Sequence, residues 1–232
     1  MTKLGTFYGI GVGPGDPELL TVKAINAIKS VDVIIAPKTE KKEGSVALSI
    51  ARSYLKPEVE IVYQVFPMIK TFAESPEVFA ENTAEIVSIL RQGKNAAFLT
   101  IGDPMFYSTY IYIFRLLERE GVNVETIPGI PAFLAIASKL GRPLAFGNEI
   151  ISIIPATAPR EAIEAALNAC DAAVLMKVYK NFDEIVDALD RHGKLDDAIL
   201  ASRCGLSDEK IIDDLAAHRD EQPNYLSTII TK

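Results

Sequence analysis

Residues 99–109 read LTIGDPMFYST, and this stretch decides the fold class. The apolar run at residues 96–101 stops abruptly at Gly-Asp-Pro, and a segment rich in hydroxyl groups and aromatic rings follows. This order is typical of a buried strand that enters a tight loop and then a helix. Open α/β sheets bind ligands at such loops, at the carboxyl ends of strands. We therefore expect a ligand site here, followed by a helix from about Met105 to near Gly121.

A second loop of the same kind lies near the N-terminus, where residues 11–17 read GVGPGDP. Asp16 before Pro17 predicts a helix start with Asp16 as its N-terminal cap. Further along, short apolar runs alternate with amphipathic segments, which predicts α/β sheets. Strands are expected at residues 7–12, 33–36 with Pro37 as the stop, 59–65, 96–101, 122–127, 150–154, 172–178, 198–203 and 225–231.

The punctuation Pro128-Gly129-Ile130-Pro131 predicts a domain boundary. We expect an N-terminal α/β domain at residues 1–127 and a C-terminal α/β domain at residues 128–232, with a ligand cleft between them. One continuous sheet is the alternative that the sequence leaves open.

Charge and composition exclude several classes of function. The 232 residues include 24 Lys and Arg against 31 Asp and Glu, for a formal net charge of −7 without a basic stripe, so we expect no nucleic-acid partner. The sequence has no apolar run near the roughly 20 residues of a membrane helix and no signal peptide, which predicts a cytoplasmic protein without a membrane partner. Its two cysteines and two histidines lack metal-ligand spacing, so no metal site is expected.

The first loop does not match the dinucleotide or P-loop fingerprints. Gly11-x-Gly13-x-Gly15 places its third glycine one residue earlier than the dinucleotide fingerprint Gly-x-Gly-x-x-Gly does. Pro14 also stiffens the turn that would approach a pyrophosphate. No Gly-Lys-Ser/Thr follows, so a phosphate-cradling loop is also excluded. These glycines therefore indicate either a sharp turn alone or a different ligand.

Taken together, the loops resemble the tetrapyrrole (corrin/porphyrin) methyltransferases, across essentially the whole chain. The motifs that carry the resemblance, in order, are GPGDP with Leu20-Thr21, residues 32–37, Gly102-Asp103-Pro104 and Pro128-Gly129-Ile130. Residues 5–21, Phe66-Pro67-Met68 and residues 97–110 look like one branch, which methylates carbon 20 of precorrin-2 or its cobalt form in cobalamin biosynthesis. The resemblance implies two α/β domains, S-adenosylmethionine as methyl donor and S-adenosylhomocysteine as product.

The resemblance also assigns site residues. The positions that match cofactor contacts are Pro14, Ile101, Gly102, Asp103, Phe106, Pro131, Ala132, Met176, Arg203 and Cys204. Many relatives have Thr or Ser at position 131, so Pro131 removes a hydroxyl and an amide donor. Gly15 and Asp16 match the tetrapyrrole side of the first loop. The substrate carries several carboxylates, for which the candidate cations are Lys38, Lys42 and Arg142, with Lys41, Lys177 and Arg203 as further candidates.

The implied reaction moves a methyl group to a ring carbon that is nucleophilic in the manner of an enamine. The enzyme's tasks are therefore alignment and electrostatics, with removal of one proton after transfer. Asp103, Tyr107 and Tyr110 are the candidate proton acceptors, although the tyrosines also suit a protein core. The resemblance further implies a homodimer.

Three alternatives stay open. Another methyltransferase of the same superfamily, such as diphthine synthase or an enzyme for a different corrinoid carbon, would share these loops. A nicotinamide-dependent oxidoreductase is disfavoured by the broken fingerprint. A non-catalytic carrier of tetrapyrrole or adenosyl compounds would bind in the same place without turnover.

Overall fold

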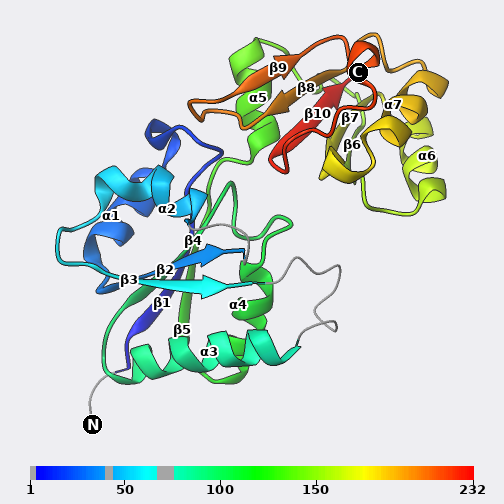
Figure 1. The fold of residues 1–232 in the computed structure, drawn as a ribbon. Helices are drawn as coiled ribbons and strands as arrows, with labels where there is room; N and C mark the ends of the chain where they lie inside the picture. The colour runs from blue at the N-terminus through cyan, green and yellow to red at the C-terminus, as the bar shows by residue number, and fades with distance from the viewer. Residues whose placement is uncertain (1–3, 40–43, 67–75) are drawn as a thin grey trace. The chain divides into compact units, whose positions relative to one another are not determined.

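The computed structural model describes residues 4–39, 44–66 and 76–232 of the chain. The chain divides into two compact units, Met1–Pro131 and Ala132–Lys232. Each unit has a five-stranded sheet of its own, so the fold is α/β with two separate sheets (Figure 1).

The sheet of the first unit is parallel, with the strand order β3-β2-β4-β1-β5. Its strands are β1 (Thr6–Gly11), β2 (Val33–Lys38), β3 (Glu60–Val65), β4 (Ala96–Thr100) and β5 (Asn123–Ile127). The central strands β2 and β4 consist largely of buried residues, because helices cover both faces of such a sheet.

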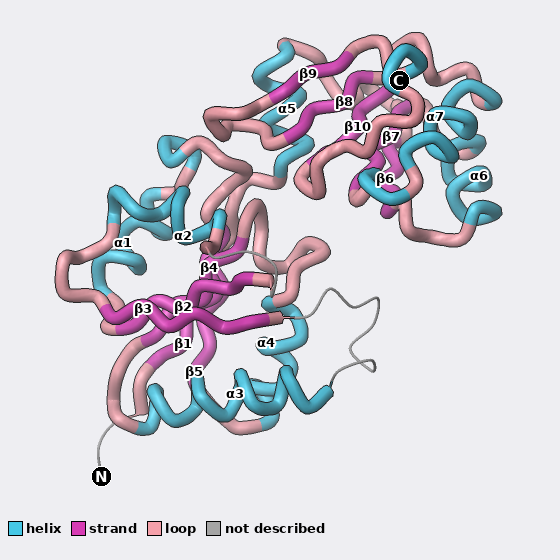
Figure 2. Tube along the Cα trace, in the orientation of Figure 1, coloured by secondary structure: helices cyan, strands magenta, loops and turns pink. Residues whose placement is uncertain are grey.

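Two pairs of helices cover the sheet of the first unit. The helices α1 (Val22–Ser30) and α2 (Val46–Ala51) lie on one face, and α3 (Pro76–Arg91) and α4 (Tyr110–Arg119) lie on the other (Figures 1 and 2). Phe79, Phe98 and Tyr110 belong to the core between the sheet and the second pair. Along β4, alternation places Ala96, Phe98 and Thr100 on the α3/α4 face.

The second unit has a mixed sheet with the order β6-β7-β10-β8-β9. Its strands are β6 (Ile151–Pro155), β7 (Ala172–Met176), β8 (Ile199–Ser202), β9 (Lys210–Ile212) and β10 (Ser227–Thr231). Because β10 is antiparallel to both β7 and β8, those two strands run in the same direction. The helices α6 (Arg160–Asn168) and α7 (Phe182–Arg191) pack over the main core, and α5 (Ala132–Leu140) contacts β10.

Most expected strands are present within one or two residues, but two expectations about the elements are wrong, and one strand of the structure has no counterpart among the expected strands. The helix after the second loop begins at Tyr110 rather than Met105, because Tyr107 has a left-handed backbone with φ of 49°. The strand β2 continues through Pro37, which pairs with Gln64 of β3 and lies beyond the last residue that pairs with β4. The short edge strand β9 carries no strong alternation and was not expected.

The Asp16 cap is confirmed, on a shorter element than expected. Its carboxylate accepts a hydrogen bond of 2.8 Å from the Glu18 amide, and it caps a 3-10 turn, η1 (Pro17–Leu19). The helix α1 then begins separately, with Thr21 as its own cap.

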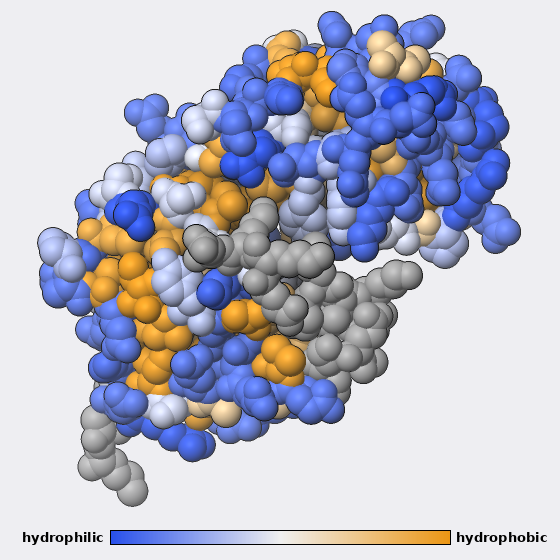
Figure 3. All heavy atoms as spheres, viewed as in Figure 1, coloured by the Kyte–Doolittle hydropathy of each residue, from blue (hydrophilic) through white to orange (hydrophobic). Residues whose placement is uncertain are grey.

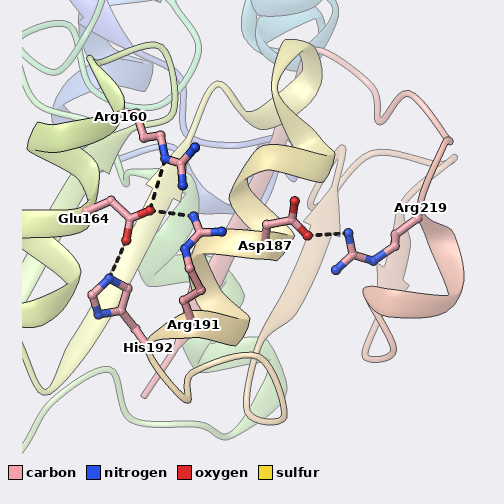
Figure 4. A network of polar contacts seen from close by, with 6 residues as sticks. All are labelled: Arg160, Glu164, Asp187, Arg191, His192 and Arg219. Carbon is pink, nitrogen blue, oxygen red and sulfur yellow. Dashed lines mark hydrogen bonds and ion pairs between the residues drawn. The ribbon is translucent and has the colours of Figure 1, made fainter.

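The carboxylate of Glu164 in α6 contacts Arg160 of the same helix and Arg191 and His192 at the end of α7 (Figure 4). Glu164 accepts hydrogen bonds from Arg191 at 2.5 Å and His192 at 2.6 Å, and Arg160 lies 3.4 Å away. These contacts, with Arg191 contributing most, lower the pKa of Glu164 from 4.5 to about 2.

The stability of the protein in acid should depend on Glu164. A carboxyl with a lowered pKa in the native state stabilises the fold above its unfolded pKa, and this contribution is lost as the pH falls from about 4.5 through about 2. We expect Glu164→Gln to reduce the slope of unfolding free energy against pH in this window, measured by urea denaturation. Glu161→Gln, on the exposed side of the same helix, is the control. Equal slopes for wild type and Glu164→Gln would contradict the prediction.

The visible surface over α6 and α7 is largely hydrophilic (Figure 3). Within residues 4–39, 44–66 and 76–232, no helix combines the length and apolarity that crossing a bilayer requires.

Candidate active site

The carboxyl ends of β1 and β4 form the switch point of the first sheet. The two strands are neighbours, but the chain runs from β1 to β2 in one direction across the sheet and from β4 to β5 in the other. Loops that leave adjacent strands toward opposite faces open a crevice at the strand ends, where α/β proteins bind ligands. Both Gly-Asp-Pro loops begin at this position.

Backbone hydrogen bonds fasten the two loops to each other. The Val12 amide donates to the Thr100 carbonyl at 2.9 Å, and the Gly102 amide donates to the Gly13 carbonyl at 2.8 Å. Gly13 and Gly102 pair as an isolated antiparallel bridge and have φ of 75° and 71°. Other residues rarely adopt such angles, which explains why both positions are glycine.

Asp103 ties the loop after β4 to the loop after β5. One carboxylate oxygen accepts from the Met105 amide at 2.8 Å, and the other accepts from the Gly129 amide at 3.0 Å. The helix α4 begins seven residues later, so Asp103 is not the cap of a helix and the loop is not a helix N-terminus. Its carboxylate therefore fixes loop geometry through two backbone amides.

Close backbone contact explains the glycines at the strand ends. A Cβ on Gly11 would lie 2.5 Å from the Gly129 nitrogen and 2.6 Å from the Gly102 oxygen. A Cβ on Gly129 would overlap the same oxygen. The turns after β1, β4 and β5 therefore meet at their backbones, and we name Gly11, Gly102, Asp103 and Gly129 the three-turn junction.

The aromatic residues after Asp103 have different surroundings. Phe106 and Tyr107 have ring centroids 4.7 Å apart, and Tyr107 is exposed and left-handed. A left-handed non-glycine residue is strained, and such strain concentrates at functional sites. Phe106 and Tyr107 follow Asp103 within four residues, so they are candidate contacts for a ligand at the strand ends.

Tyr110 lies in the core instead. It is 0% exposed, packs near the rings of Phe7 and Phe98, and its hydroxyl shares a 2.7 Å hydrogen bond with the Thr126 hydroxyl. Burial raises the pKa of Tyr110. The catalytic role assigned to Tyr110 stays a prediction, and its position favours a role in packing.

A Tyr110→Phe variant separates these roles. Loss of the Thr126 contact should lower the unfolding free energy by about 1 kcal/mol, with kcat within twofold of wild type. Chemical denaturation and steady-state kinetics measure the two quantities. A tenfold lower kcat at unchanged stability would instead place the hydroxyl in the reaction.

The second unit has its own cluster of predicted residues. Met176 ends β7, Arg203 follows β8, and the carboxyl ends of these two strands lie at the same edge of the sheet. Lys177 and Arg203, the residues that follow the two strands, are both left-handed, with φ of 61° and 55°. Partial burial lowers the pKa of Lys177. Two strained residues at strand ends on the same edge of the sheet again indicate a functional edge.

Residues 203–209 form a cross-linked loop at this edge. The Arg203 guanidinium pairs with Asp208 at 2.6 Å, so its charge is partly committed within the loop. Glu209 accepts from the Gly205 amide at 2.5 Å and pairs with Lys139 of α5 at 2.5 Å. Cys204 is buried, and burial first, then Glu209, raises its thiol pKa to about 11. A thiol with that pKa is protonated at neutral pH, so it is no nucleophile.

The other predicted residues are distributed over both units. Pro14 and Gly15 are buried in the first loop, Lys38 ends β2 with its ammonium 5.6 Å from the Tyr63 ring centroid, and Ile101 lies beside Gly102. Arg142 pairs with Asp197 at 2.9 Å within the second unit. Pro131 ends the first unit and Ala132 begins α5. Lys41 and Lys42 lie outside the described residues.

The sequence did not identify every residue of this edge. The sequence presents Gly129 only as part of a boundary and of a family motif, whereas the structure joins its amide to Asp103, 26 positions away. The predicted strand at residues 96–101 includes Thr100 without a functional role, and the structure shows its buried hydroxyl without a hydrogen-bond partner among the described residues. Among the described residues, no three His, Cys, Asp or Glu side chains gather as metal ligands.

Comparisons with known proteins identify the family. The chain matches the family model of tetrapyrrole (corrin/porphyrin) methylases over residues 6–218. It is 38% identical to a cobalt-precorrin-2 C(20)-methyltransferase of Salmonella typhimurium (97% of this chain, 95% of that protein) and 33% identical to a precorrin-2 C(20)-methyltransferase of a Sinorhizobium species (98% and 95%). A uroporphyrin-III C-methyltransferase of Thermus thermophilus, solved with S-adenosylhomocysteine, has the same fold, with a TM-score of 0.72 at 22% identity (98% and 97%). This chain belongs to the tetrapyrrole methylase family.

Proposed function

We propose that this protein transfers a methyl group from S-adenosylmethionine to carbon 20 of precorrin-2 or cobalt-precorrin-2, a step of cobalamin biosynthesis. Two relatives of nearly the same length, named for this reaction, support the proposal. The observation on this chain that carries it is the three-turn junction, which contains Gly102 and Asp103, two of the residues that the family resemblance assigns to the cofactor.

The chain's own residues suit S-adenosylmethionine at this edge. Hydrogen bonds hold the backbone turns at Gly102 and Asp103, and Thr100 beside them has a buried hydroxyl without a partner among the described residues. We assign further residues to the cofactor, following the family resemblance. In the first unit and at its end they are Pro14, Ile101, Phe106 and Pro131. In the second unit they are Ala132, Met176, Arg203 and Cys204. The cofactor supplies an electrophilic methyl group.

The protein contributes alignment more than chemical activation. A loop that already has its binding conformation holds the methyl donor without a reorganisation energy during the reaction. Preorganised sites lower the activation barrier in this way. Asp103 keeps that loop in place through two amide contacts. Tyr107, exposed beside Phe106, is the residue we favour for accepting or relaying the proton that leaves the methylated ring.

Cationic side chains and residues of the first loop are our candidates for binding the tetrapyrrole substrate. We assign the tetrapyrrole carboxylates to Lys38 and Lys177, with Gly15 and Asp16 of the first loop close to the ring. Lys38 is supported by its position at the carboxyl end of β2, and Lys177 by its strained backbone after β7. Arg142 and Lys42 remain candidates from the sequence, and Arg142 would have to leave Asp197 to bind a carboxylate. We further propose that the enzyme is a cytoplasmic homodimer, as the family resemblance implies.

Mass spectrometry of one incubation tests the proposal. The purified protein is mixed with S-adenosylmethionine and precorrin-2, in separate reactions with and without cobalt in the ring. A gain of one methyl group on the tetrapyrrole is expected, and the form that reacts identifies the substrate. Methylation of added protein instead would identify the diphthine synthase alternative, and ligand binding without any methyl gain would identify a carrier.

A further inference from the structure

Thr100 stands out as an unpaired polar group at the ligand edge. It is the last residue of β4, is 8% exposed, and its hydroxyl oxygen is buried without a hydrogen-bond partner among the described residues. Folding normally pairs buried hydroxyls, because an unpaired one loses its contacts with water and gains nothing in return. The position of Thr100 therefore needs an explanation.

The register of the sheet places this hydroxyl beside the three-turn junction. Thr100 pairs with Gly11 of β1, and alternation puts both residues on the α3/α4 face of the sheet. On that face, the space at Gly11 is filled by the backbones of Gly102 and Gly129. The Thr100 side chain thus lies next to the turns that we assign to the cofactor.

Two other buried polar atoms lack partners in the described structure, and neither shares this position. Gln64 Oε1 belongs to an amide whose nitrogen already donates to the Asn82 carbonyl and the Glu85 carboxylate of α3, so the side chain has a structural role. His218 Nδ1 lies 3.1 Å from a Glu221 oxygen and pairs with it when the imidazole is protonated. Thr100 alone of the three lies at the switch point.

We propose that the Thr100 hydroxyl donates a hydrogen bond to a carboxylate of the ligand held at the switch point. A carboxylate is the anionic group that both S-adenosylmethionine and the tetrapyrrole carry, and a hydrogen bond to an anion compensates a buried hydroxyl better than one to a neutral acceptor. The inference rests on the proposed function and adds a binding residue to it.

Removal of the Thr100 hydroxyl should have opposite effects on the stability of the ligand-free protein and on ligand binding. Thr100→Val removes the hydroxyl and keeps a β-branched side chain of the same shape, so the ligand-free protein should gain about 2–4 °C in Tm. The same variant should bind its carboxylate ligand about 10- to 100-fold more weakly. Thr100→Ser, which keeps the hydroxyl, should bind like wild type within a few-fold.

Thr83→Val is the matched control. Thr83 is equally buried in α3, but its hydroxyl donates to the Phe79 carbonyl at 2.7 Å. The same atom change should therefore lower Tm and leave ligand affinity unchanged.

Two binding measurements identify the source of the carboxylate. If it belongs to the cofactor, Thr100→Val raises the Kd for S-adenosylhomocysteine in calorimetry, and it reduces the preference for S-adenosylmethionine over its decarboxylated form. If it belongs to the tetrapyrrole, the variant raises the substrate KM and leaves the Kd for S-adenosylhomocysteine unchanged. Unchanged Kd and KM, within twofold, would overturn the inference and leave a buried water as the hydroxyl's partner. Wild-type protein that binds S-adenosylhomocysteine but methylates no tetrapyrrole would count against the proposed function and not against the cofactor arm.

Discussion

Gly129→Ala should destabilise the protein by about 3–5 kcal/mol and abolish measurable cofactor binding. The added methyl carbon would overlap the Gly102 carbonyl oxygen and lie 2.8 Å from Gly11 Cα. All of these neighbours are backbone atoms, which cannot move aside as the end of a side chain can. Relief of the overlap would require one turn of the junction to separate from the others, and the Gly129 amide would then lose Asp103. Urea denaturation and calorimetry with S-adenosylhomocysteine measure the two effects.

Gly44→Ala is the control for this variant. Nothing lies within 4 Å of a Cβ built on Gly44, and its backbone is not left-handed. The substitution should leave stability and binding within 0.5 kcal/mol of wild type, as ordinary surface changes do. If Gly129→Ala behaves like Gly44→Ala, the three-turn junction does not determine the site.

Asp103→Ala should weaken cofactor binding about 10- to 100-fold and lower the unfolding free energy by about 1–3 kcal/mol. The substitution leaves the amides of Met105 and Gly129 without their acceptor, and it releases the link between the turns after β4 and β5. Calorimetric titration and denaturation of the same preparation separate the two losses.

Asp16→Ala provides the comparison for stability. Asp16 occupies the same Gly-Asp-Pro position in the first loop and accepts a hydrogen bond of the same length, 2.8 Å, from the amide two residues on. The described contacts of the Asp16 carboxylate include no counterpart of the bond between Asp103 and Gly129. Asp16→Ala should therefore lower the unfolding free energy less than Asp103→Ala does. Equal losses would show that the Gly129 contact contributes nothing.

Asp103→Asn tests the catalytic assignment separately. Asparagine keeps one acceptor oxygen, so its stability and cofactor affinity should lie between those of wild type and alanine. An acid–base role adds a drop in kcat at saturating ligand beyond the loss in affinity. Full turnover with normal affinity would remove Asp103 from both roles.

Local sequence patterns were sufficient for most of the fold. The apolar runs at β1, β4 and β7 predicted strands because burial on both faces demands continuous apolar sequence. The pattern failed at residues 105–109, where Ser108 and the left-handed Tyr107 delay the helix α4 until Tyr110. A backbone angle of this kind depends on the packing of neighbouring turns, which no local pattern records.

The sequence by itself determined the α/β class, the two Gly-Asp-Pro loops and the family, because strands, tight turns and motifs depend on residues close together in the chain. The tertiary structure alone decided that Asp103 binds the Gly129 amide, that Gly11 meets Gly102 and Gly129, and that Tyr110 is a core residue. It also decided that the Thr100 hydroxyl has no partner among the described residues. Each of these contacts, or the lack of one, depends on segments brought together by strand order. The strand β4 lies between β1 and β2 and pairs with both. This pairing joins residues far apart in the chain, so a local sequence pattern does not predict it.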